Sequence, residues 1–147
     1  MREHIHSDAS MTLGEAIRKM RASETEDFTS RTSTDLEQLT DQHDAVHVLF
    51  GCGTSVQDEI AAHVWMLFAT TANLSEMHRA VATQEHGRAV SGIGHVKLMS
   101  IWLASLPRII GILFKSLRMK KRVAMEELSR LKSQSLTEIR QEHGITL

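Results

Sequence analysis

The sequence predicts an all-α protein, a single compact helical domain of about six or seven helices packed as an orthogonal bundle. Three observations predict this class. Only one proline occurs in 147 residues, and the helix formers Ala, Leu, Met, Glu and Arg are abundant. Five capping patterns, each a Ser, Thr or Asn with Glu or Gln three residues later, mark helix starts. Apolar residues recur at intervals of three and four, and no segment alternates as a strand does.

The first third of the chain divides into a polar end, a short helix, a linker and a longer helix. Residues 1–11 are polar and predict a disordered N-terminus, so the single domain spans 12–147. A helix is expected over 13–22. The segment 22–33, rich in Ser, Thr and acids, predicts a mobile linker. The helix predicted over 35–50 has an apolar stripe formed by Leu36, Leu39, Val46 and Phe50.

The remaining helices follow a glycine break at 51–53, which resembles a helix C-cap. Helices are predicted over 55–71 and 74–90 from their capping patterns and apolar spacing. The segment 96–119 is the most apolar part of the chain, and 125–147 forms one or two further helices. With 41% apolar and 24% charged residues, the composition is typical of a soluble globular domain.

Two histidines and one glutamate are the candidate metal ligands. His43 and His47 are four residues apart, so on a helix their rings lie on one face, one turn apart. Glu59 lies beyond the glycine break, where a second helix can bring its carboxylate back to them. Two imidazoles and a carboxylate form a known zinc ligand set. Because the chain has nine histidines, a polar helix face or two buried histidines satisfied by their neighbours are alternatives.

Cys52 and His63 lie near the candidate ligands in the sequence and are considered next. Cys52 excludes an internal disulfide because it is the single cysteine. It is interpreted as a small loop or core residue, with a thiolate ligand as the alternative. His63, four residues after Glu59, is a candidate outer partner of the site or a packed or solvated histidine.

The apolar segment ends in a cluster of cations. The residues predicted to contact lipid or membrane are Leu98, Ile101, Trp102, Ile109, Leu113, Lys115, Arg118, Lys120, Lys121 and Arg122. An apolar face beside basic residues is typical of a peripheral membrane protein. A kinked or paired core helix with a solvated basic end is the alternative. A spanning helix is not expected, because Pro107-Arg108 and Lys115 interrupt the run.

Charge is divided unevenly along the chain. Residues 1–59 carry twelve acids against five Lys or Arg, and residues 60–147 carry six against twelve. This division predicts a basic surface in the second part. The basic cluster lacks interleaved aromatic residues, so no nucleic-acid partner is expected. The start of the chain lacks a signal-peptide core and is too acidic for a mitochondrial leader, which predicts a cytoplasmic protein.

The motif His43-Asp44-Ala45-Val46-His47, eleven residues and then Glu59, resembles the signature of the coenzyme Q (ubiquinone) biosynthesis protein Coq-four family. The final segment, from Leu136 to Ile145, is similar to that family's ending. By resemblance, His43, Asp44, His47 and Glu59 bind the metal. Asp44 points about 100° away from His43 around a helix, so it either reaches the ion or orients a ligand histidine.

The resemblance implies an all-helical fold and a role in ubiquinone biosynthesis at a membrane. Family members bind a polyprenylated intermediate and replace the ring carboxyl at C1 with hydroxyl, or act as scaffolds for the biosynthetic enzymes. The implied partners are a polyprenylated quinone precursor or another isoprenoid lipid, the membrane surface, other quinone-biosynthesis proteins and a second copy in a homodimer. The implied location is the inner face of a bacterial membrane.

This chain departs from the family in two respects. It is shorter than typical members, and Val64-Trp65-Met66-Leu67 stands where they carry a further acid. Both departures leave the metal ligands in place. They affect the region that would determine specificity for the substrate ring and bind the lipid. Zinc fits the ligand set best, and iron or manganese also accepts it. A small helical regulator without a metal is the weakest alternative.

Overall fold

The computed structural model describes residues 10–23, 34–73 and 94–147. In this part of the chain the protein is all-α, as predicted, and contains no strand. The elements are α1 (Leu13–Ser23), α2 (Thr34–Leu49), α3 (Val56–Ala69), α6 (His95–Leu117), a 3-10 turn (Met125–Glu127), α7 (Leu128–Leu131) and α8 (Leu136–His143). The predicted disordered end, the linker over 22–33 and the helix over 74–90 fall wholly or largely outside the described residues.

Capping residues set the helix starts. The backbone N–H of Glu15 donates to Thr12 Oγ1, and Glu15 accepts from the N–H of Thr12, so this predicted box is confirmed. The box at Ser135 and Glu138 is also confirmed. The third is wrong by one residue, because Ser55 rather than Thr54 caps α3 and accepts from the N–H of Asp58 at 3.1 Å.

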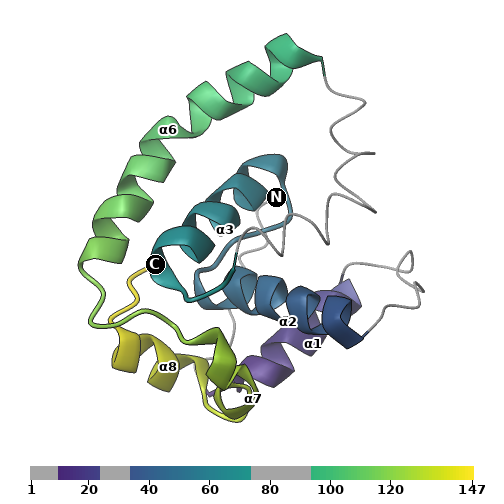
Figure 1. Cartoon of the computed structure of the whole chain (residues 1–147), viewed down its shortest axis with the longest axis vertical. Coiled ribbons are helices and arrows are strands. Elements are labelled where there is room, and N and C mark those ends of the chain that lie inside the picture. The colour runs from purple at the N-terminus through teal and green to yellow at the C-terminus, as the bar shows by residue number, and fades with distance from the viewer. Residues whose placement is uncertain (1–9, 24–33, 74–93) are drawn as a thin grey trace.

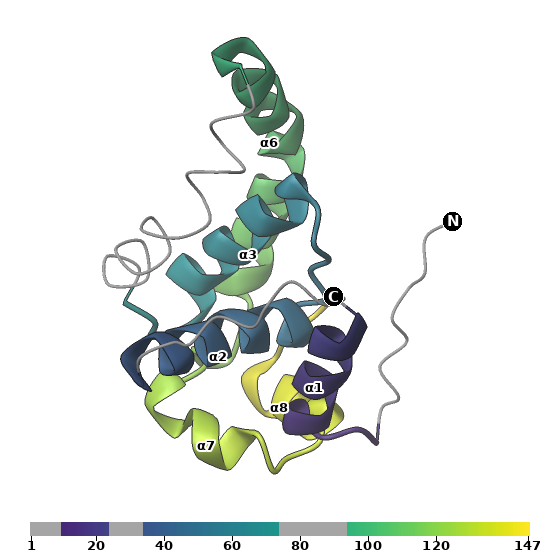
Figure 2. The ribbon, with the colours of Figure 1, turned by 90° about the vertical axis from the view of Figure 1, so that its right-hand side faces the viewer.

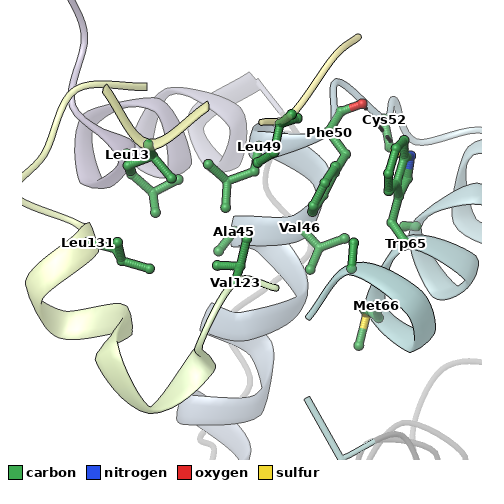
Figure 3. Close-up of a cluster of buried hydrophobic side chains, with 14 of the residues drawn as sticks. Leu13, Ala45, Val46, Leu49, Phe50, Cys52, Trp65, Met66, Val123 and Leu131 are labelled. Atoms are coloured by element: carbon green, nitrogen blue, oxygen red, sulfur yellow. Dashed lines mark hydrogen bonds between the residues drawn. The ribbon is translucent and has the colours of Figure 1, made fainter. Parts of the chain in front are cut away.

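The core forms where α1, α2 and α3 meet the C-terminal segment (Figure 3). Its fully buried side chains include Leu13 from α1, Val46 and Leu49 from α2, and Met66 from α3. The rings of Phe50 and Trp65 stack with their centroids 4.3 Å apart, which joins the end of α2 to α3. Burial of this apolar surface fixes how α2 and α3 face each other.

The C-terminal segment packs against the rest of the domain and contacts the last turn of α2 (Figure 1). The guanidinium of Arg140, on α8, donates to the carbonyl oxygens of Leu49 at 3.0 Å and Val48 at 2.9 Å. These carbonyls belong to the last turn of α2, where a helix lacks its own donors and carries partial negative charge. Arg140 therefore caps the helix that carries His43 and His47.

Helix α6 packs along α3, and its N-terminal half projects beyond the rest of the domain (Figure 2). It continues through Pro107, which was expected to interrupt it, and only Ser105 and Ile112 are buried. The alternative of a core helix is therefore wrong. By length and composition α6 could cross a membrane. From the sequence no spanning helix is expected, because Pro107-Arg108 and Lys115 interrupt the apolar run.

Candidate metal centre

Three side chains from two helices converge on one point. His43 and His47 project from α2, and Glu59 projects from the first turn of α3. The two Nε2 atoms are 3.3 Å apart. Glu59 places Oε2 3.1 Å from His43 Nε2 and Oε1 3.3 Å from His47 Nε2. Among the described residues, these side chains form the group that could hold a metal ion.

The turn between α2 and α3 produces this convergence. Gly51 has φ 64°, a left-handed conformation that side chains rarely adopt, and it ends α2. The N–H of Cys52 then donates to the His47 carbonyl at 2.8 Å, which folds the loop back over the histidines. Because Ser55 caps α3 immediately afterwards, Glu59 is delivered within the first turn of that helix.

The loop also fixes the proton of His47. Its Nδ1 lies 2.9 Å from the carbonyl oxygen of Gly53, and a carbonyl only accepts, so Nδ1 carries the hydrogen. In the neutral ring, Nε2 then presents its lone pair toward Glu59 and His43. The ring is almost fully buried. Histidines that bind metals characteristically donate their other ring N–H to a carbonyl or carboxylate, and His47 is held in that manner.

The metal-free site carries a pair of opposite charges. Burial lowers the pKa of His43, but the carboxylates of Asp44 and Glu59 outweigh burial and raise it to about 9. Burial raises the pKa of Glu59, but the hydrogen bond from His43 and the positive charge on that ring outweigh it and bring the pKa well below its usual range. At neutral pH a metal ion therefore has to displace a proton from His43.

The spacing of the three ligand atoms fits a small divalent ion. Zinc binds imidazole nitrogen and carboxylate oxygen at about 2.0–2.1 Å, so two ligands of a tetrahedral ion lie about 3.3 Å apart. The observed separations of 3.1–3.3 Å, in which Glu59 faces each imidazole with a different carboxylate oxygen, are close to this value. The side chains of His43 and Glu59 are 22% and 30% exposed, so the group is partly open to solvent. Three protein ligands with an approach from solvent are typical of catalytic zinc sites.

Asp44, the fourth residue of the motif, lies outside this group. Arg21 on α1 donates from Nε to Asp44 Oδ2 at 2.7 Å, and its terminal nitrogen lies 2.6 Å from the same oxygen. The other oxygen, Oδ1, faces Nδ1 of His43 at 3.8 Å. The structure thus places Asp44 behind His43, on the side away from Glu59.

His63 and Cys52, which lie near the candidate ligands in the sequence, occupy different environments. His63 donates from Nδ1 to the backbone carbonyl of Glu59 at 2.7 Å, and its ring centroid is 5.9 Å from that of His43. It lies beside the group but is not part of it. Cys52 is buried, and burial raises the pKa of its thiol to about 12, which agrees with the interpretation as a core residue.

Two arginines that support the site were not identified from the sequence. Arg140 lies in the C-terminal segment that carried the family resemblance, so that resemblance was a signal for it. Arg21 lies in no motif, and nothing local predicts that it would meet Asp44, 23 residues later.

The residues predicted to contact lipid lie on α6 and in the segment that directly follows it. Leu98, Ile101, Ile109 and Leu113 are half-buried, whereas Trp102 is 46% exposed. Lys115 is half-buried, and Arg118, Lys120, Lys121 and Arg122 are exposed. A larger apolar surface occupies a neighbouring face. This exposed apolar face of α6 consists of Val96, Met99, Leu103, Leu106, Ile110, Phe114 and Leu117, each at least 44% exposed.

One ion pair joins α6 to the start of α3, the helix that carries Glu59. Arg108 lies 2.8 Å from Oδ1 of Asp58, the residue immediately before Glu59. The middle of α6 is therefore fixed close to the candidate metal centre.

Comparisons with protein-family models, curated proteins and solved structures find no match for this chain.

Proposed function

We propose that this chain is a metal-dependent, prenyl-lipid-binding protein of ubiquinone biosynthesis that acts at the inner face of a bacterial membrane. The observation that carries the proposal is the convergence of His43, His47 and Glu59, with the proton of His47 fixed by Gly53. The motif that resembles the Coq-four family supplies these ligands, and their separations suit zinc, with iron or manganese as alternatives.

The substrate we propose is a ring with a carboxyl group at C1 and a polyprenyl tail. Replacement of the carboxyl by hydroxyl breaks one C–C bond, forms one C–O bond and releases carbon dioxide. The hydroxyl oxygen comes from water, and two electrons pass to dioxygen, which leaves as hydrogen peroxide. A bound divalent ion would supply a Lewis acid for an oxygen of the head group. The chain itself would hold the ion through His43, His47 and Glu59 and exclude bulk water through the buried ring of His47.

The tail and the membrane would be held by α6. Its exposed apolar face runs from Val96 to Leu117, a distance of about 33 Å along a helix. Each methylene that it removes from water contributes about 0.8 kcal/mol. Because the opposite face of the C-terminal half of α6 packs on α3, only one side of that half remains for lipid, which favours a helix lying along the bilayer over one that crosses it.

The cations at the end of α6 would contact anionic lipid. Lys121 already pairs with Glu142 at 2.5 Å, and Lys120 donates to the carbonyl of Gln141 at 3.3 Å. Arg118 and Arg122 should therefore contribute more to binding than the two lysines. Reversing the charge at Lys120, Lys121 and Arg122 together should weaken binding to anionic vesicles, and added salt should have the same effect.

A pair of adjacent substitutions tests the apolar face. Leu103 belongs to it, whereas Ala104 is exposed on another side of α6. Both substitutions add the same charge to the same helix. Leu103→Asp should nevertheless reduce binding to phosphatidylglycerol vesicles much more than Ala104→Asp, because only Leu103 lies on the apolar face. Equal losses, or no vesicle binding by the wild type at low salt, would contradict membrane docking through this face.

The reaction is tested with a polyprenylated 4-hydroxybenzoate, the purified metal-loaded chain and dioxygen. Mass spectrometry should detect the product in which hydroxyl replaces carboxyl, and His47→Ala should form none.

The second candidate is a lipid-binding scaffold without a reaction, favoured by the large exposed face of α6. A wild type that binds metal and lipid but forms no product would refute the enzymatic proposal and support the scaffold.

A further inference from the structure

The strongest unassigned feature is a chain of charged side chains that reaches the candidate metal centre from α1. Arg21 stands between two carboxylates of α2. Its terminal nitrogen is 2.6 Å from Asp41 Oδ1 and 2.6 Å from Asp44 Oδ2, and its Nε also binds Asp44 Oδ2 at 2.7 Å. Lys132 binds the remaining oxygen of Asp41. The network thus connects α1, α2 and the segment after α7.

We infer that Arg21 is a positioning residue of the metal centre, acting through Asp44 on His43. Both donors of Arg21 that reach Asp44 bind Oδ2, which leaves Oδ1 directed at Nδ1 of His43 at 3.8 Å. The Nε2 atom on the opposite side of the same ring faces Glu59 and His47. At 3.8 Å this contact is electrostatic and not a hydrogen bond, and a carboxylate at this place favours one orientation of the ring and increases its basicity.

Arg21 suits this task because its own position is fixed at several points. The carboxylate of Asp41 holds the guanidinium from a second direction, and a planar guanidinium fixes the orientation of a carboxylate better than an ammonium does. The start of α1 is hydrogen-bonded to the segment after α7, with Leu13 donating to the Gln134 carbonyl and Gly14 to that of Lys132, both at 3.0 Å.

The same contacts explain why Asp44 stands outside the ligand group. Its side chain is 13% exposed, and Oδ2 accepts a charge-assisted hydrogen bond from Arg21 Nε and forms an ion pair with the terminal nitrogen of Arg21. Turning this carboxylate to the metal would break both contacts and leave the guanidinium facing Asp41 alone. Arg21 therefore keeps the centre at three protein ligands and leaves a position for substrate. This inference rests on the proposed metal centre.

The test uses cobalt as a probe. Metal-free wild type, Arg21→Gln, Asp44→Asn and the double variant are titrated with Co²⁺, and the visible spectrum reports both the affinity and the coordination of the ion. Arg21→Gln should weaken binding about tenfold or more and change the spectrum, the range typical for loss of a residue behind a ligand. The double variant should be no weaker than the weaker single variant, since both act on the same ring. Arg21→Lys should recover part of the loss.

Arg18→Gln is the matched control, because Arg18 is exposed on the same helix and is not part of this network. It should keep the wild-type affinity and spectrum. If Arg21→Gln folds poorly by circular dichroism, Asp44→Asn and Arg21→Lys carry the test. Wild-type affinity and spectrum in these variants would overturn the positioning role alone. A wild type that binds no Co²⁺ would overturn the metal centre, and with it this inference.

Discussion

Replacing Arg140 with methionine should weaken both the fold and the metal centre. The guanidinium is half-buried, and its two hydrogen bonds satisfy the carbonyls of Val48 and Leu49 at the end of α2. Hydrogen bonds from a charged donor contribute about 1.5–3 kcal/mol each. Burial lowers the pKa of Arg140, so part of this gain offsets the cost of burying its charge. A net loss of about 2 kcal/mol in the free energy of unfolding is expected.

Urea denaturation of the metal-free protein measures this loss, and Arg130→Met provides the matched control. Arg130 is 55% exposed and pairs with Glu127 three residues earlier on the surface. Exposed pairs contribute between about 0 and 1 kcal/mol, so the control should change stability little. Equal losses in the two variants would refute the reasoning that Arg140 caps α2. Because α2 carries two of the ligands, Arg140→Met should also weaken zinc binding, as measured by competition with a chromophoric chelator.

Three further predictions concern stability. Because the folded pKa of His43 is raised from 6.5 to about 9, its contribution is complete below pH 6.5 and disappears as pH rises through about 9. Urea denaturation of the metal-free protein should show this decline, and His43→Gln should remove it. Gly144→Ala should lower the free energy of unfolding by about 1–2 kcal/mol, because Gly144 has φ 69° and an added Cβ would lie 3.0 Å from the Lys120 backbone nitrogen. Gly111→Ala, where a Cβ meets nothing within 4 Å, should instead stabilise α6 by about 0.5–1 kcal/mol in the same assay.

The grouping of His43, His47 and Glu59 was largely predictable because its determinants are local. The spacing of His43 and His47 places both rings on one helix face, and the glycine break allows Glu59 to return to them. The starts of α1 and α8 were predictable for the same reason, since a cap involves residues three apart. The error at Thr54 arose because Ser55 with Asp58 forms an equally good cap one residue later.

The features that could not be predicted depend on packing between distant segments. Arg21 meets Asp44 only because α1 lies against α2, and no local pattern encodes that contact. The orientation of α6 was undetermined because the helix has apolar residues on two faces. Ile109 and Leu103 are equally apolar in the sequence, yet the first is half-buried and the second is 60% exposed. The packing of α6 on α3 decides between them.

The central claim is that His43, His47 and Glu59 bind one divalent metal ion. Elemental analysis of the protein, purified without a histidine tag and without chelator, tests it most directly. We expect about one ion per chain in the wild type, loss of that ion in His47→Ala and Glu59→Gln, and retention in His95→Ala, because His95 is exposed at the start of α6. A wild type without metal, or the same metal content in His47→Ala as in the wild type, would contradict the claim.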